Sequence, residues 1–181
     1  MIDPTSAEKS TEDEEARKLQ KPVASEEMVR EMLGKNFGME VHEVKALESY
    51  DDCNFLIKAA HEKAKEVSKF LLKLYNGIES KSGIIEGYSE LLNHVTKKET
   101  GIDVSVPVVS PALNSDILPI MQCPTLGGTP VDLSARLFQW VEGDTMYTAG
   151  SSPALLVSSG KALGAVTAAL QDFDHSSFHR T

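Results

Sequence analysis

The sequence is poor in several residue types on which whole classes of protein depend. Its 181 residues include two cysteines, Cys53 and Cys123. Two cysteines cannot build the disulfide framework of a small secreted domain or fill a zinc knuckle. Hydrophobic residues make up 41% of the chain, which is enough to form a buried core. We therefore expect a cytoplasmic protein with one folded domain that depends on hydrophobic packing.

Basic residues and long apolar runs are also scarce. The chain has 18 lysines and arginines against 27 aspartates and glutamates, which gives a formal net charge of −9. Since a nucleic-acid-binding surface normally carries a basic excess, we expect no nucleic-acid partner. Apolar runs such as residues 70–72 and 153–157 are far shorter than the roughly 20 residues that a membrane-spanning helix needs. We therefore expect no membrane partner either.

The N-terminal residues 1–22 are predicted to form a disordered polar tail. Met1–Lys21 contain almost no large apolar side chains, so burial cannot offset the entropy that would be lost on ordering. Order is expected to begin near Ser25, which can cap a helix with an acidic first turn. Apolar residues at helical spacing continue to Phe37, and Gly38 is a typical stop signal.

The rest of the chain alternates between strand-like and helical patterns. The charged residues 61–68 separate two strand-like runs and are predicted to form a hairpin loop. Prolines 107 and 119 favour edge strands or loops for the runs that contain them. The pattern as a whole predicts an α+β fold with a mostly antiparallel sheet and helices to one side. The predicted strands are Val41–Leu47, Asn54–Ala60, Phe70–Tyr75, Val104–Val109, Ile117–Gln122 and Leu133–Val141, and the later helices are Ile84–Val95 and about 153–173.

Four segments resemble, in order and spacing, parts of one enzyme family. They are Leu47–Phe55, Phe70–Asn76, Arg136–Gly143 and Leu163–Leu170. They are similar to the phosphate-loop region, third strand, hinge strand and following helix of the hydroxylysine kinase family, in the aminoglycoside phosphotransferase and choline kinase superfamily. The resemblance runs from about residue 25 to residue 180. It implies a protein-kinase-like N-lobe over residues 23–143, with its hinge, and the start of a truncated C-lobe over residues 144–181.

The resemblance also implies an activity and its cofactors. The family transfers a γ-phosphate from GTP, or in related enzymes ATP, to the hydroxyl of 5-hydroxylysine, a small amino-acid-like substrate, in lysine catabolism. In this superfamily the catalytic base and the Mg²⁺ ligands come from segments downstream of the helix that follows the hinge. Asp172 and Asp174 imitate a metal-binding pair but lie before the place of a catalytic loop. We therefore expect a fragment with no catalytic residue, no metal site and no kinase activity of its own.

Two other interpretations stay open. The chain could be a non-catalytic short form that binds nucleotide or docks a partner. The helix after residue 153 would then present an exposed apolar stripe to that partner. The chain could also be an unrelated α+β binding module in which the kinase-like spacing is accidental. The residues of the apolar stripe are Leu156, Leu163, Val166 and Leu170.

Lys73 is the first candidate for a nucleotide-binding residue. Its neighbours Leu72 and Leu74 point to the opposite face of the strand, as alternation requires. In kinase folds the corresponding lysine binds the phosphates and is held by a carboxylate on the next helix. Glu86 and Glu90 lie one helical turn apart, and either could be that partner. The competing interpretation is a solvent-facing lysine on an edge strand.

The other candidates come from the phosphate-loop and hinge segments. Residues 49–54 contain no glycine, so Ser49 and the backbone N–H groups would have to donate to the phosphates, while Asn54 could fix the turn. A polar β-turn without a ligand is the alternative. The resemblance assigns Gln139, Trp140 and Val141 to the hinge that borders the nucleobase. The competing interpretation of Trp140, which we favour, is a tryptophan in the core or at the interface between the lobes.

Overall fold

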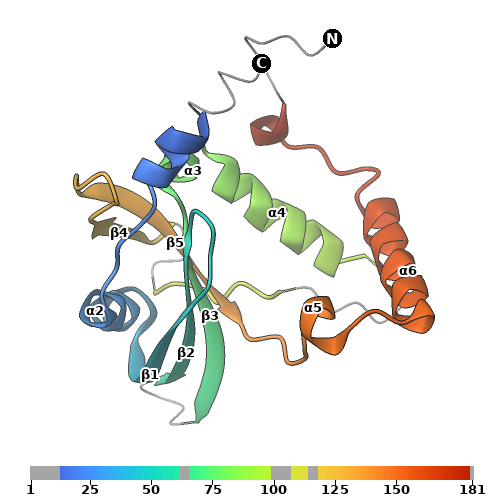
Figure 1. Cartoon of the computed structure of the whole chain (residues 1–181), viewed down its shortest axis with the longest axis horizontal. Coiled ribbons are helices and arrows are strands. Elements are labelled where there is room, and N and C mark those ends of the chain that lie inside the picture. The colour runs from blue at the N-terminus through green and yellow to red at the C-terminus, as the bar shows by residue number, and fades with distance from the viewer. Residues whose placement is uncertain (1–12, 62–65, 99–106, 114–117, 180–181) are drawn as a thin grey trace.

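The fold is built on a five-stranded antiparallel sheet with the strand order β1-β2-β3-β5-β4. The structure is a computed structural model, and it describes residues 13–61, 66–98, 107–113 and 118–179. Figure 1 shows the twisted sheet with α2 and α4 on opposite sides of it. The strands are β1 (Met39–Leu47), β2 (Cys53–His61), β3 (Val67–Leu74), β4 (Ile120–Cys123) and β5 (Val131–Gln139). The helices are α2 (Glu26–Phe37), α3 (Gly77–Lys81), α4 (Ile84–Thr96), α5 (Met146–Ala149) and α6 (Pro153–Ala169), with a short 3₁₀ helix, η1 (Ser176–Phe178).

Most of the predicted strands are confirmed. β1, β2 and β3 cover the first three predicted runs and pair in sequence as an antiparallel meander. β5 covers the run predicted over residues 133–141, and β4 covers the end of the run over residues 117–122. Residues 104–106 of the strand predicted over residues 104–109 lie outside the described residues, and Val109 makes an isolated bridge to Phe138. The predicted loop over residues 61–68 also lies partly outside them.

One face of the sheet is buried under α2, and the other carries α4. Strand alternation sends Leu72 and Leu74 toward α2, where both are fully buried, and Lys73 toward α4. The expectation of helices to one side is therefore wrong. The second face mixes polar and half-buried apolar residues, so its pattern resembles a solvated surface although α4 covers part of it. The core includes Val29, Met32, Leu33, Phe37, Phe55, Ile57, Phe70, Leu72, Leu74, Leu133 and Leu137.

The ends of α2 agree with the sequence signals. The Ser25 hydroxyl accepts a hydrogen bond from Met28 N at 3.3 Å, which satisfies one of the free N–H groups of the first turn. Gly38 has φ 61°, the left-handed conformation that ends helices, and its N–H donates to Gly34 O at 3.1 Å. The chain thereby turns directly from α2 into β1.

Alanine substitutions at Gly34, within α2, and at Gly38, just after it, are expected to change the free energy of unfolding in opposite directions. At Gly38 an added Cβ meets both a positive φ and Leu113 Cδ2 at 3.3 Å, so Gly38→Ala should lower the free energy of unfolding by about 1 kcal/mol. At Gly34 the nearest atom to a Cβ, Met39 O, is 3.9 Å away, so Gly34→Ala should raise it by about 0.5–1 kcal/mol. Urea denaturation measures the free energy of unfolding of both variants, and changes of the same sign in the two would contradict this account.

Part of the predicted N-terminal tail is ordered. Residues 13–19 are helical, and Val23 N donates to Pro124 O at 2.8 Å beside a β-bridge between Pro22 and Thr125. The prediction of disorder up to residue 22 therefore differs from the structure for residues 13–22. The composition argument counted apolar side chains, whereas this segment is held mainly by hydrogen bonds and ion pairs to other parts of the chain.

The residues after α6 pack along α4. Asp172 accepts from Lys98 Nζ at 2.6 Å and lies 3.0 Å from His94 Nε2. The rings of Tyr88 and Phe178 lie 5.6 Å apart, so η1 also contacts this helix. These contacts join the C-terminal segment to the same helix that covers the second face of the sheet.

α6 begins at Pro153 as predicted, after the cap residue Ser152, and ends at Ala169. Leu156 and Leu163 are 54% and 70% exposed, as expected for the apolar stripe. Val166 and Leu170 are instead half-buried. Among the described residues, no helix is long and apolar enough to cross a bilayer.

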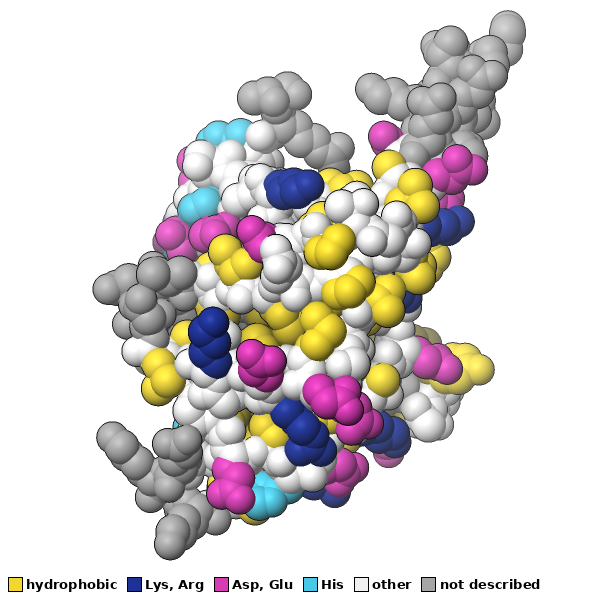
Figure 2. All heavy atoms as spheres, turned by 90° about the vertical axis from the view of Figure 1, so that its left-hand side faces the viewer, with side chains coloured by type: hydrophobic (Ala, Val, Ile, Leu, Met, Phe, Trp, Pro, Cys, Tyr) yellow, Lys and Arg dark blue, Asp and Glu magenta, His cyan; other side chains and the backbone are white. Residues whose placement is uncertain are grey.

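The surface on the side of α2 does not gather charge of one sign. Figure 2 views the left-hand side of Figure 1 and shows lysines and arginines scattered, with acidic side chains beside several of them. Hydrophobic side chains gather across the middle of the same face. The described residues of this face therefore form no continuous basic stripe of the kind that follows a nucleic-acid backbone.

Candidate functional site

A row of polar side chains crosses the face of the sheet that faces α4. Asn54, Lys73 and Arg136 lie directly opposite one another on β2, β3 and β5. All three are half-buried. Because directly opposed residues share a face of an antiparallel pair, the row brings two positive charges and an amide together. The prediction that Lys73 faces away from Leu72 and Leu74 is confirmed.

A cavity of about 460 Å³ opens beside Lys73. Tyr75 and Tyr88 contribute aromatic walls to it, and Lys73 Nζ lies 5.1 Å from the centre of the Tyr75 ring. Burial raises the pKa of Tyr75 to about 12, so its phenol is neutral at physiological pH. The charged residues that line the cavity are Arg17, Asp51, Asp52, Lys73 and Glu79.

Lys73 is paired with Asp52, and this differs from the prediction. Its Nζ contacts Asp52 Oδ2, while Asp52 Oδ1 accepts from Asn76 N at 2.8 Å. The predicted partners lie elsewhere: Glu90 Oε2 is 3.6 Å from His175 Nε2, and Glu86 is exposed. The loop between β1 and β2 supplies the carboxylate that the sequence interpretation sought on α4. That pairing depends on how the loop folds back over β3, which no local spacing reveals.

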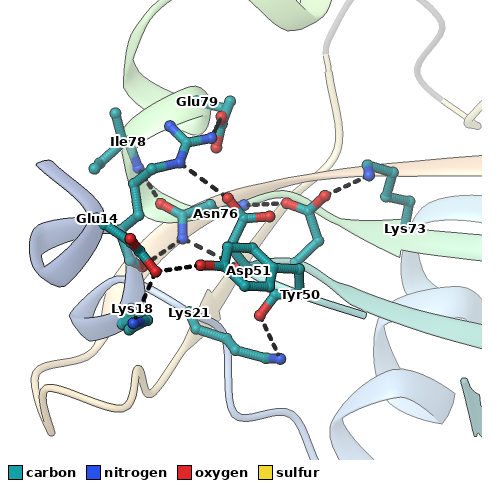
Figure 3. Close-up of polar contacts among 11 residues, drawn as sticks. Glu14, Lys18, Lys21, Tyr50, Asp51, Lys73, Asn76, Ile78 and Glu79 are labelled. Carbon is teal, nitrogen blue, oxygen red and sulfur yellow. Dashed lines mark hydrogen bonds and ion pairs between the residues drawn. The ribbon is translucent and has the colours of Figure 1, made fainter. Parts of the chain in front are cut away.

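Asn76 organises the loop and was missed by the sequence interpretation. Its side chain is fully buried, and its Oδ1 accepts from Ile78 N at 3.0 Å, which caps α3. Its Nδ2 donates to Arg17 O at 2.8 Å and to Asp51 O at 3.1 Å. Figure 3 shows this amide between the N-terminal helix and the loop. An asparagine followed by glycine after a strand is the local signal that could have indicated a cap.

The N-terminal segment holds the same loop from its other side. Lys21 Nζ donates to Ser49 O at 2.6 Å and to Tyr50 O at 2.8 Å. Arg17 Nε donates to Asp51 Oδ2 at 3.0 Å, and Arg17 also contacts Glu79 (Figure 3). The glycine-free loop is thus fixed through its carbonyls and carboxylates, and the carbonyl of the candidate Ser49 is one of the anchors.

Asn54 does not fix the turn as expected. It lies within β2, opposite Lys73, and its buried Oδ1 accepts no hydrogen bond from any described residue. The side chains that bond the turn are Asn76 and Lys21. Asn54 therefore presents an unused acceptor at the polar row.

Arg136, rather than Lys73, ties the sheet to α4. Its Nε and Nη2 donate to Ser89 Oγ at 3.0 and 2.6 Å. Burial lowers the pKa of the Arg136 guanidinium, and the charge of Glu86 partly opposes that effect. The predicted helix residue Glu86 therefore acts on the cation of β5 through its charge.

The predicted hinge residues lie at the end of β5 and just after it, but they border a different cavity. Gln139 N donates to Val108 O at 2.9 Å, and Trp140 N donates to Lys69 O at 3.1 Å. Gln139 and the half-buried Trp140 line a separate cavity of about 630 Å³, and Val141 is 48% exposed. The structure thus brings Lys73 together with the β1–β2 loop but places the hinge candidates beside the other end of β3.

No group of three or more His, Cys, Asp or Glu side chains that could hold a metal ion occurs within the part of the chain that the structure describes. Asp51 and Asp52, which line the cavity beside Lys73, are paired with Arg17 and Lys73 respectively. The carboxylates at the cavity therefore serve as partners of cations in this structure.

Comparison with known proteins gives similarity over most of the chain. It is 26% identical over 142 residues to the hydroxylysine kinase of Xenopus laevis, covering 78% of this chain and 37% of that protein. It is 26% identical over 156 residues to the hydroxylysine kinase of Danio rerio, covering 86% of this chain and 41% of that protein. No protein-family model and no solved structure matches the chain. The chain spans about two fifths of the length of the curated relatives it matches, and it is similar to hydroxylysine kinases over that span.

Proposed function

We propose that the chain binds GTP or ATP, with Mg²⁺, as the nucleotide-binding part of a small-molecule kinase of the hydroxylysine kinase type. The observation that carries the proposal is Lys73, which lies on β3 beside a cavity of about 460 Å³ and under a helix that follows the strand. A lysine on the third strand of an antiparallel sheet, followed by a helix, is the arrangement by which kinase N-lobes hold nucleotide phosphates. The similarity to two hydroxylysine kinases supports the same function.

The substrate proposal follows from the relatives. A kinase of this type would transfer the γ-phosphate to the hydroxyl of a small amino-acid-like molecule. Mg²⁺ would neutralise charge on the phosphates and would enter with the nucleotide. We assign no catalytic residue within this chain, so the proposal concerns nucleotide binding.

Nucleotide binding requires an exchange of partners at Lys73. Its Nζ is paired with Asp52, and both side chains are largely buried, at 28% and 13% exposure. A phosphate oxygen would replace Asp52 Oδ2, while Asp52 Oδ1 could keep its bond to Asn76 N. Partly buried charges interact more strongly than exposed ones, so the environment that strengthens the Lys73–Asp52 pair would also strengthen a pair between Lys73 and a phosphate oxygen.

The test is equilibrium binding of MgGTP and MgATP to the wild-type chain and to Lys73→Met. We expect the variant to bind about tenfold more weakly or worse, since it loses a charge-assisted hydrogen bond and leaves Asp52 unpaired near the phosphates. Lys69→Met is the matched control, because Lys69 lies on the same face of β3 and pairs with Glu142 at 2.6 Å. Absence of binding to the wild type, or equal affinities of wild type and Lys73→Met, would overturn the proposal.

A further inference from the structure

A second, smaller cavity lies on the other side of β5 from the Lys73 cavity. It has a volume of about 220 Å³ and is lined in part by residues of β5 and α4 and by residues 109–112. Pockets that enclose drug-sized ligands usually measure about 300–1,000 Å³, so this one suits a smaller molecule. Its polar lining residues are Arg136, Ser89, Asn93 and Ser110.

Among the described residues, no carboxylate lines this cavity beside Arg136, and Glu86 acts on the Arg136 guanidinium only through its charge. The guanidinium of Arg136 is half-buried and directs its Nε and Nη2 to one neutral oxygen, Ser89 Oγ. By contrast, Arg17 and Lys73 are each paired with an aspartate. Burial disfavours the charged form of Arg136, so an anion in direct contact with the guanidinium would stabilise it.

The hydrogen-bonding groups around Arg136 also suit an anion. A guanidinium has five N–H donors in a planar fork, and the bonds to Ser89 leave Nη1 and the second N–H of Nη2 available to bind two oxygens at once. Ser110 is buried at 6% exposure, and its hydroxyl can donate, as can the amide of Asn93.

We propose that this cavity binds a small oxyanion of phosphate size, with Arg136 as its principal ligand and Ser89, Asn93 and Ser110 as further donors. The anion would neutralise Arg136 and complete the connection between β5 and α4. The site is separate from the nucleotide cavity, so it does not depend on the proposed kinase function. Free inorganic phosphate is the source to which we commit, because a cavity of about 220 Å³ is smaller than those that usually hold drug-sized ligands.

The first experiment titrates inorganic phosphate into the wild-type chain at constant ionic strength and follows binding by calorimetry and thermal unfolding. A ligand that binds the native state raises the unfolding temperature by mass action. We expect Arg136→Gln to weaken phosphate binding roughly tenfold or more, since it removes a bidentate charge-assisted contact. Arg30→Gln is the control, because Arg30 lies on α2 and bonds Val41 O. Equal phosphate affinity in wild type and Arg136→Gln would overturn the proposal.

Two further arms separate this site from the nucleotide cavity and from misfolding. We expect a phosphate site that is lost in Arg136→Gln to persist in Lys73→Met; loss of all phosphate binding in Lys73→Met, with binding retained in Arg136→Gln, would place the anion at Lys73 and overturn the proposal. Arg136→Lys keeps the charge but not the fork, so a folded Arg136→Lys protein should still bind phosphate more weakly than wild type. Phosphate should also shift the amide NMR signals of Ser89, Asn93 and Ser110. Signal shifts confined to residues around Lys73, or no shifts at all, would contradict the proposed anion site.

Discussion

Replacing Asn76 with alanine is expected to lower the free energy of unfolding by about 3 kcal/mol, because three buried or partly buried backbone groups lose their partner at once. These groups are Ile78 N, Arg17 O and Asp51 O. Asn76 itself is fully buried, so the cavity left by its side chain is not simply filled by solvent. The N-terminal helix, the β1–β2 loop and α3 should all loosen together, since this one amide joins them.

Urea denaturation monitored by circular dichroism measures the loss. Asn36→Ala is the matched control, because the Asn36 amide is half-buried and donates only a local bond, to Met32 O at 3.1 Å. Asn76→Asp separates the two roles of the residue: it keeps the acceptor that caps α3 but loses both Nδ2 donors and adds charge near Asp51 and Asp52. We expect it to be at least as destabilising as alanine. If Asn76→Ala costs no more than the control, the loop is held by its ion pairs instead.

Leu137→Ala is expected to lower the free energy of unfolding by about 3 kcal/mol, the usual cost of removing a fully buried leucine from a core. Leu137 lies on β5 between Arg136 and Phe138, but it faces α2 and has no exposed surface. Leu156→Ala on α6 is the control, since that leucine is 54% exposed and its truncation should cost within about 0.5 kcal/mol. The two variants should differ clearly in the urea concentration at mid-transition.

The comparison between Leu137 and Leu156 also tests the arrangement of the sheet. Both residues are leucines in apolar segments, and the structure places Leu137 in the core and Leu156 on the surface. Similar losses for the two variants would mean that α6 packs against something in solution or that β5 does not pack under α2.

The regular elements were predictable because their patterns are local. The helix from residue 26 to 37 has a cap, an apolar repeat and a glycine stop within fourteen residues, from Ser25 to Gly38. The alternation of β3 was enough to place the Lys73 side chain on the other face of the sheet from Leu72 and Leu74. α3 was not predicted, because five residues beginning with Gly77 carry too little periodicity.

The candidate site was less predictable, because its contacts join distant parts of the chain. Asp52 pairs with Lys73, Arg17 pairs with Asp51, and Ser89 bonds Arg136. Each pairing depends on the folding of a loop or the strand order. The place of β5 beside β3 sets Arg136 opposite Lys73, whereas sequence order alone would leave the two unrelated. Polar networks of this kind leave no periodic signal.

The position of β5 next to β3 has a consequence for synthesis on the ribosome. β1, β2 and β3 form a meander that can pair as soon as they emerge, but the second edge of β3 stays open until β5 appears. At about 5–20 residues per second, translation from Leu74 to Gln139 takes roughly 3–13 s. During that time the unpaired backbone groups along this edge of β3, and the apolar side chains of Phe70, Leu72 and Leu74 beside them, are available to other strands. A nascent chain paused in this interval should therefore recruit holding chaperones, and the recruitment should end once residue 139 has left the exit tunnel.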